Sequence, residues 1–167
     1  MLLTSLIFLN LVYISFVVIF NYAQVVLVGI IQESMNSRIG HIYLYASDLD
    51  KSYEFYKKLL EYLGYTQTVK KDWGFAFVNN GTSLWFEKTP EDGSGQGYSR
   101  RRTGLNHIAF RVNSKEEVDK FHDEFVKSNK LVTLYETPKA FPEYDEDYYA
   151  VFFEDPDGIK LEVAYYP

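Results

Sequence analysis

The sequence predicts an α+β domain made of two βαβββ modules whose mixed sheets face each other across a cleft. One alternating pattern of apolar and polar residues occurs twice, at residues 41–46 and 107–112, and each copy begins with a histidine. A helical pattern and then further strand-like runs follow each copy in the same order. A repeat of this kind indicates one structural unit that is used twice.

The first module is expected to span about residues 38–95. After its opening strand, Asp48 is a good N-cap for a helix that should end near Gly64. Strands are predicted at residues 65–70, 74–78 and 82–88, and an Asn-Asn-Gly hairpin turn at 79–81 joins the last two.

The second module is expected at about residues 104–167 and follows a Gly- and Ser-rich linker at 89–103. Ser114 should cap its helix, and Glu117 has the spacing of a capping box. Strands are predicted at residues 131–135, 148–154 and 159–165. An Asp-Pro-Asp-Gly turn at 155–158 joins the last two strands.

Composition limits the kinds of chemistry that the chain can perform. The 167 residues include no cysteine, which excludes disulfides, cysteine nucleophiles and thiolate metal sites. A net charge of −6 argues against nucleic acid as a partner, and the three arginines at 100–102 lie in the linker, where they form a solvated segment or an anion clamp. The aromatic content of 18% fits β-sheet and a hydrophobic cleft that binds a small molecule.

The N-terminal segment, residues 1–34, is predicted to be separate from this domain. Residues 1–32 carry no charge, and residues 2–20 are apolar enough to span a bilayer as a helix. One interpretation is a membrane anchor, which would place the domain at a membrane. The other is an over-extended gene prediction with Met35 as the true start, which would make the protein cytoplasmic.

Strand periodicity predicts a metal site. Because side chains alternate across a strand, His41 and Glu87 of the first module should point away from its helix. His107 and Glu162 should do the same in the second module. Facing sheets would then bring together two imidazoles and two carboxylates, a set that suits one divalent ion of Zn, Ni, Fe, Mn or Co.

Each of these residues also has a purely structural interpretation. A single strand histidine is more often a hydrogen-bonding rim residue, and a single strand glutamate is usually solvated. Tyr43, Trp85 and Tyr149 either line the cleft and contact substrate or pack within the sheets. Arg111 either meets an anionic substrate or forms a surface ion pair. His122 lies on the second helix and is not expected to be a ligand.

Three segments of the sequence resemble the vicinal oxygen chelate superfamily. They are residues 41–49 with Phe55 and Tyr56, residues 104–110, and residues 153–162 with the Asp-Pro-Asp-Gly turn. This superfamily contains glyoxalase I, the extradiol dioxygenases, and the fosfomycin and bleomycin resistance proteins. The resemblance covers residues 38–167 and implies paired modules around a divalent metal, either within one chain or exchanged between the chains of a homodimer.

The resemblance also implies a role for each candidate ligand. His41, His107 and Glu162 match the superfamily's common metal ligands, and Glu87 falls on the fourth ligand of glyoxalase I. A fourth carboxylate favours glyoxalase-like isomerase or lyase chemistry, in which Glu162 or Glu87 moves a proton between neighbouring carbons. The alternatives are an Fe(II) extradiol-type dioxygenase that uses the other three ligands, and a protein that binds or modifies an antibiotic.

Overall fold

The computed structural model describes residues 13, 15, 19, 35–93, 95 and 97–167. The chain divides into two units between Arg38 and Ile39, and the unit Ile39–Pro167 contains every strand of the described residues. The predicted N-terminal segment lies almost wholly outside the described residues. Within the described part of the chain, no helix is long and apolar enough to cross a membrane.

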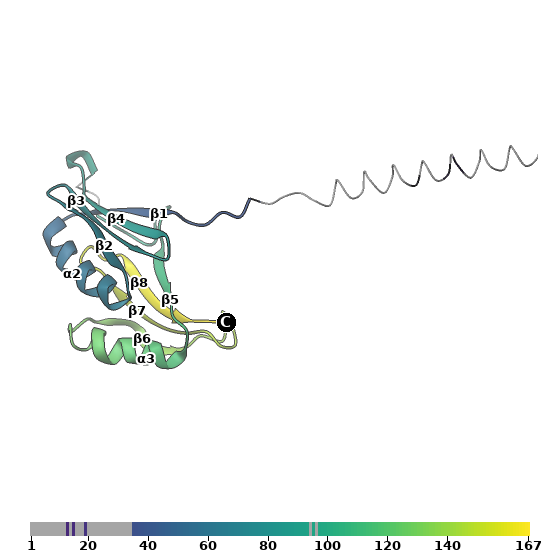
Figure 1. The fold of residues 1–167 in the computed structure, drawn as a ribbon. Coiled ribbons are helices and arrows are strands. Elements are labelled where there is room, and N and C mark those ends of the chain that lie inside the picture. The colour runs from purple at the N-terminus through teal and green to yellow at the C-terminus, as the bar shows by residue number, and fades with distance from the viewer. Residues whose placement is uncertain (1–12, 14, 16–18, 20–34, 94, 96) are drawn as a thin grey trace, which may run out of the picture. The chain divides into compact units, whose positions relative to one another are not determined.

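Two four-stranded mixed sheets form the domain, each with one helix on one of its faces (Figure 1). In the first sheet β1 is parallel to β4, the other pairs are antiparallel, and the strand order is β1-β4-β3-β2. This module consists of β1 (His41–Ala46), α2 (Leu49–Tyr62), β2 (Thr66–Lys71), β3 (Gly74–Asn79) and β4 (Thr82–Lys88).

The second sheet repeats the first, with the order β5-β8-β7-β6 and a parallel pair between β5 and β8. Its helix continues through a short π-helical segment, η2. This module consists of β5 (His107–Arg111), α3 (Lys115–Phe121), η2 (His122–Val126), β6 (Thr133–Ala140), β7 (Tyr149–Glu154) and β8 (Lys160–Tyr165). The linker between the modules contains the short helix η1 (Glu91–Gly93). The predicted pair of βαβββ modules is therefore confirmed.

The predicted helix caps are present in both modules. The Asp48 carboxylate accepts from the backbone N–H of Lys51 at 3.0 Å, and the Ser114 hydroxyl accepts from that of Glu117 at 3.3 Å. The capping box differs in one respect, because the Glu117 side chain accepts from the N–H of Asn113 at 2.8 Å. Both helices therefore begin where the sequence predicts.

Strand β6 departs most from the prediction. It runs from Thr133 to Ala140, beyond the expected end at residue 135, and its pairing with β7 shifts after Leu134. Tyr135 and Glu136 adopt positive φ values of 60° and 55°, which local sequence patterns do not predict for such residues. The bulge arises at the edge of the sheet, where one side of the strand has no partner to impose a register.

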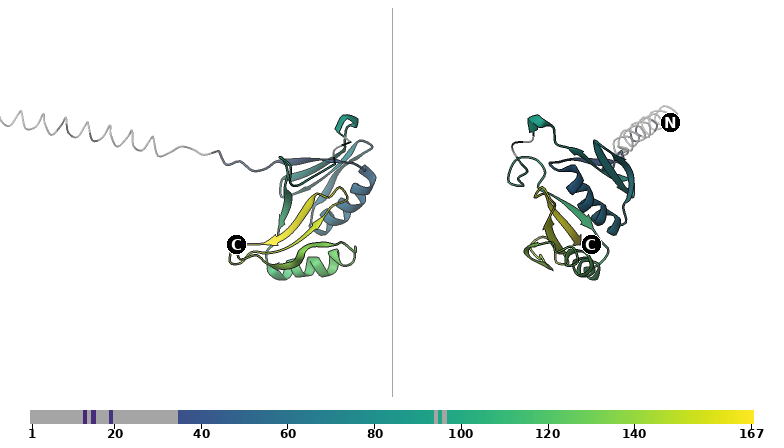
Figure 2. Two further views of the ribbon diagram at one scale, coloured as in Figure 1. Left: turned by 180° about the vertical axis from the view of Figure 1, so that it is seen from behind. Right: turned by 90° about the vertical axis from the view of Figure 1, so that its left-hand side faces the viewer.

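One hydrophobic core joins the two modules. It lies on the helix-facing sides of both sheets, and its largest fully buried side chains are Tyr56, Phe75, Phe77, Phe86, Phe121 and Phe153. The views in Figure 2 show each helix beside its own sheet. On the opposite face of the second sheet lies a second, smaller buried cluster, which consists of Phe141, Ala150, Phe152 and Ala164.

Two polar contacts also tie the modules together at the turn that follows β7. The Tyr56 hydroxyl on α2 donates to Asp155 at 2.8 Å, and both groups are buried. Ser47, at the end of β1, donates its backbone N–H to Asp157 at 3.1 Å, and its hydroxyl also bonds that carboxylate. The Asp-Pro-Asp-Gly turn of the second module is thus anchored on the first.

Replacement of Gly74 by alanine is expected to destabilise the domain by about 2–3 kcal/mol, because cores tolerate added volume poorly. A Cβ at this position would lie 2.4 Å from the backbone oxygen of Phe86, and a backbone atom in a paired strand cannot move aside. Chemical denaturation measures the effect. Gly40→Ala is the matched control, since its Cβ would meet nothing within 4 Å. Equal stabilities of the two variants would contradict the packing described for β3.

Candidate functional site

The sheet faces that turn away from the helices carry the predicted ligands. In β1 the exposed residues are His41, Tyr43 and Tyr45, while Leu44 and Ala46 are buried. In β5 the alternation is the same, with Ile108 and Phe110 buried and His107, Ala109 and Arg111 more exposed. The predicted orientation of both histidines is therefore confirmed.

His107 and Glu162 lie together on the face of the second sheet that turns away from its helix, which we call the open face of that sheet. The His107 Nε2 is 3.1 Å from Glu162 Oε2, and only 1% of the Glu162 side chain is exposed. The other carboxylate oxygen, Oε1, accepts a hydrogen bond from the Tyr148 hydroxyl at 2.6 Å. A carboxylate this deeply buried is costly unless charge or hydrogen bonds compensate it.

The contact with Asn106 places a proton on one nitrogen of the His107 ring. Its Nδ1 lies 2.7 Å from Asn106 Oδ1, and the Asn106 amide nitrogen donates to the Arg100 carbonyl at 3.2 Å, which sets the orientation of the amide. Nδ1 must therefore carry the proton. A neutral imidazole has one N–H, so its Nε2 then faces Glu162 Oε2 with no proton between the two acceptors.

Electrostatics favours the neutral imidazole. Burial of the ring and the nearby Lys160 ammonium lower the pKa of His107 below its usual value, and the Glu162 carboxylate opposes them only partly. Burial, with the hydrogen bond to Glu162, raises the pKa of Tyr148, so its hydroxyl stays protonated and acts as the donor. The pair thus presents one imidazole nitrogen and one carboxylate oxygen as neighbouring electron donors.

Glu87 does not occupy the place in the first module that Glu162 occupies in the second, so the predicted equivalence is wrong. Glu162 pairs with Ala109, two residues after His107. In the first module the residue two after His41 is Tyr43, and its pairing partner on β4 is Trp85. Glu87 lies two residues beyond Trp85 on the same strand. Counting from the turn glycines gives the same result, because Gly81 precedes Trp85 by the four residues that separate Gly158 from Glu162.

The first module therefore contributes one histidine and an aromatic surface. Tyr43 stacks on Trp85 with ring centroids 6.2 Å apart and an interplanar angle of 6°, and its hydroxyl donates to Glu87 at 2.6 Å. His41 stands at the start of β1, opposite Ser83. Among the described residues, no three His, Asp or Glu side chains lie close enough to hold one metal ion. A single chain brings His107 to Glu162 but does not add His41 or Glu87.

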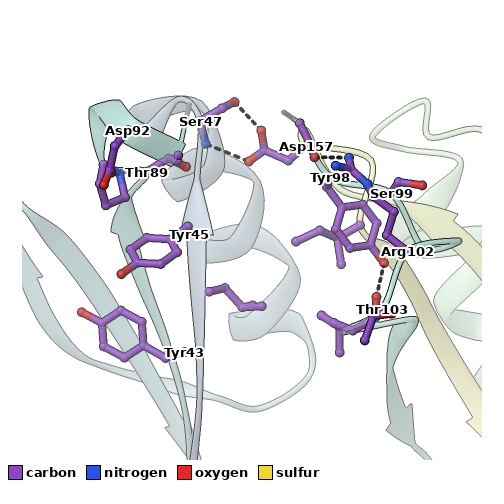
Figure 3. A pocket seen from close by; sticks show the side chains of 16 residues that line it. Tyr43, Tyr45, Ser47, Thr89, Asp92, Tyr98, Ser99, Arg102, Thr103 and Asp157 are labelled. Carbon is purple, nitrogen blue, oxygen red and sulfur yellow. Dashed lines mark hydrogen bonds between the residues drawn. The ribbon is translucent and has the colours of Figure 1, made fainter. Parts of the chain in front are cut away.

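A pocket of about 790 Å³ opens beside this aromatic surface (Figure 3). Tyr43 and Tyr45 of β1 form one wall, and Tyr98 and Arg102 of the linker lie across from them. The hydrogen bonds between Ser47 and Asp157 close one end. Its volume is that of a site for a small molecule.

The remaining predicted residues fall on different faces. Arg111 lies on the open face of the second sheet, with its guanidinium 4.7 Å from the centre of the Tyr166 ring. Tyr149 packs against the core, and its hydroxyl donates to Asp119 of α3 at 2.8 Å, so it does not line the open face. His122 contacts Asp123 at 3.2 Å and lies in the helical segment η2, whereas His41 and His107 lie on strands.

Two residues of the site were missing from the sequence prediction, Tyr148 and Lys160. Strand parity could have found both. Phe152 pairs with Glu162, so the two side chains lie on the same face of the sheet. Every second residue of the predicted strand shares this face, which includes Tyr148 and excludes Tyr149. Lys160 precedes Glu162 by two residues and pairs with His107. The presence of these residues makes the site more polar and more aromatic than predicted.

Comparison with known proteins identifies the family. Residues 38–163 match the Glyoxalase/Bleomycin resistance protein/Dioxygenase superfamily, so the chain belongs to this superfamily. The chain is 37% identical to the uncharacterized protein YqjT of Bacillus subtilis over 124 residues, which cover 74% of this chain and 95% of that protein. It is 30% identical to the metallothiol transferase FosB of Lysinibacillus sphaericus over 124 residues, or 74% of this chain and 79% of FosB.

Solved structures agree with this assignment. A Bacillus halodurans protein assigned to the glyoxalases is 32% identical and superimposes with a TM-score of 0.71, covering 78% of this chain and 97% of its own. A lactoylglutathione lyase from Agrobacterium tumefaciens shares the fold at 22% identity, with a TM-score of 0.59 and coverage of 79% and 96%. The resemblance predicted from the sequence is confirmed.

Proposed function

We propose that this protein is a metal-dependent enzyme that acts on a small, oxygenated, anionic substrate. Its divalent ion would be held by His107 and Glu162 of one chain and by His41 of a second copy. The observation that carries the proposal is the 3.1 Å distance between His107 Nε2 and Oε2 of Glu162, a carboxylate that is only 1% exposed. Two acceptors this close, one of them on a buried carboxylate, are stabilised by a cation between them.

The donor set fits a first-row divalent ion such as Zn, Ni, Fe, Mn or Co. A neutral imidazole and a carboxylate are suitable ligands, and ligand histidines typically donate their other N–H to an oxygen, as His107 does to Asn106. When bound, the ion would act as a Lewis acid that polarises an oxygen of the substrate. His107 and Glu162 would orient the ion.

A second copy of the chain is the best source of the third ligand. β1 is an edge strand, and its open face exposes His41 next to Tyr43 and Tyr45. In a dimer with twofold symmetry, this face of each copy would meet the His107 face of the other, so that two equivalent sites form. A homodimer would thereby complete the metal site, since one chain supplies only two protein ligands.

Trp85 favours a site with three protein ligands over one with four. It stands where a fourth carboxylate would be in register with Glu162, and Glu87 is instead bonded by Tyr43. Three ligands reduce the support for the glyoxalase I reaction, in which Glu87 was expected to take part. The 30% identity to a metallothiol transferase supports thiol transfer to a small electrophile as the reaction. Oxygenation on Fe(II) needs the same three ligands, and oxygen uptake with catechols distinguishes it.

Charge on the open face of the second sheet supports an anionic substrate. Lys160 pairs with His107, and its ammonium lies 5.0 Å from the centre of the Phe152 ring. In the described part of the chain, no carboxylate lies within salt-bridge distance of Lys160 or Arg111. Two cations beside the proposed metal site would bind a carboxylate, phosphonate or phosphate group of the substrate.

Metal analysis of the purified protein tests the three-ligand site. We expect about one divalent ion per chain in the wild type and the same content in Glu87→Ala, because one Glu, one His and a partner's His complete the set without Glu87. Loss of the ion from Glu87→Ala would restore the four-ligand isomerase as the better hypothesis. Wild-type protein that binds no divalent ion after reconstitution would refute the proposed enzyme. Thiol consumption with fosfomycin as the probe then tests the transferase reaction.

A further inference from the structure

The environment of Glu162 distinguishes its two oxygens. Oε2 faces His107, whereas Oε1 is turned toward the Tyr148 hydroxyl and receives its hydrogen bond at 2.6 Å. Because the side chain is 1% exposed, water cannot replace this donor. The orientation of the carboxylate therefore depends on a single phenol group.

Ring contacts and backbone hydrogen bonds hold Tyr148 in place. Its ring stacks on Tyr166 with centroids 5.1 Å apart at 4°, and it packs edge-on against Tyr144 and Phe141, at 5.5 and 6.5 Å. Its backbone N–H donates to the carbonyl of Asp145, and its carbonyl accepts from the N–H of Phe141, at 3.0 and 2.9 Å. A ring held in this way has little freedom to follow Glu162 if the carboxylate turns.

From this geometry we propose that Tyr148 is a positioning residue that makes Glu162 a one-oxygen ligand. The phenol O–H occupies Oε1 and leaves Oε2 alone to face the site beside His107. An ion bound by one carboxylate oxygen keeps a coordination position that a two-oxygen ligand would fill, and substrate needs that position. The inference rests on the proposed metal site, and it assigns to Tyr148 a role that the fold does not require.

The neighbouring Tyr149 provides a matched control. It is also a tyrosine whose hydroxyl donates to a carboxylate, that of Asp119 at 2.8 Å, but on the helix side of the sheet. Tyr148→Phe and Tyr149→Phe each remove one hydroxyl and keep the ring. Only Tyr148→Phe removes a hydroxyl from the face of the sheet that carries Glu162.

The test is a titration of the full-length chain with cobalt(II) alone, followed by visible absorption and by competition with a chelator. For Tyr148→Phe we expect the dissociation constant to rise about 10–100-fold, as for other outer-sphere partners of metal ligands, and the cobalt absorption bands to shift as Glu162 becomes bidentate. Tyr149→Phe should match the wild type in both measurements. Thermal unfolding of the metal-free variants checks that both remain folded.

The outcomes separate this inference from the proposed function. Wild-type protein that binds cobalt, with Tyr148→Phe unchanged in both affinity and spectrum, would overturn the role of Tyr148 and leave the metal site intact. Wild-type protein that binds no cobalt would overturn both. An equal weakening in Tyr149→Phe would indicate a general effect on stability and would also overturn the inference.

Discussion

Replacement of Glu162 or His41 by alanine is expected to weaken binding of divalent metal by more than about 100-fold. Loss of an outer-sphere partner already costs about 10–100-fold, and these residues are proposed to touch the ion itself. Glu162 would supply the charged ligand from the second module, and His41 the single ligand from the first. Competition with a chelator of known affinity measures the change.

His122→Ala is the control for His41→Ala, because His122 lies in the helical segment η2. Among the acidic residues that the structure describes, it contacts only the adjacent Asp123. It should bind metal as the wild type does. If His41→Ala also binds normally, His41 is not a ligand, and the third position must be filled by another group. If Glu162→Ala binds normally, the contact between Glu162 and His107 has no role in metal binding.

At pH 4, replacement of Asp155 by alanine is expected to destabilise the domain by about 3 kcal/mol, since each buried donor left without an acceptor costs about 1–3 kcal/mol. The Asp155 side chain accepts from the Tyr56 hydroxyl at 2.8 Å, and from the backbone N–H groups of Asp157 and Ile159 at 2.9 and 2.7 Å. Tyr56 is 1% exposed, so water cannot take over as its partner. Urea denaturation measures the change, and Asp157→Ala, which loses only exposed bonds to Ser47, should cost far less.

The cost of Asp155→Ala should depend on pH. Burial raises the pKa of Asp155 to about 6 in the folded state, from 3.8, although its hydrogen bonds oppose the shift. A raised pKa means that the folded state binds the proton more tightly than the unfolded state does. The stabilisation from the protonated form is therefore complete below pH 3.8 and is lost as the pH rises through 6.

The difference in unfolding free energy between wild type and Asp155→Ala should accordingly shrink between pH 4 and pH 7, by about 2–3 kcal/mol if the whole shift is expressed. Denaturation curves at several pH values in this range provide the measurement. A difference that stays constant or grows toward neutral pH would show that hydrogen bonds to the ionised carboxylate dominate over its burial.

Most of the fold follows from short-range patterns. Alternation in β1 and β5 sets which side chains are buried, Asp48 and Ser114 start the helices, and the turn residues end the strands. These features are local, so a single sequence contains them. The bulge in β6 is different, because its backbone follows from pairing with β7 and from the free edge of the sheet, neither of which a local pattern records.

The site could be predicted only in part, for a related reason. The alternation of side chains along a strand predicted the correct face for all four candidate ligands: His41, Glu87, His107 and Glu162. Residues two apart on a strand share a face, so alternation alone could not distinguish Glu87 from Trp85. Register between strands decides that question. Whether His41 meets His107 within a chain or between chains depends on how the modules pack, and periodicity holds no information about packing.

The most direct test of a site shared between two chains is to mix the His41→Ala and Glu162→Ala variants. Each alone should bind metal more than about 100-fold more weakly than the wild type. In a dimer formed from one chain of each, an intact His41 meets an intact His107 and Glu162 at one of the two sites. After unfolding and refolding of an equal mixture, random pairing should restore about a quarter of the wild-type metal content. A mixture that binds no more metal than the separate variants would contradict the shared site and place all of the ligands within one chain.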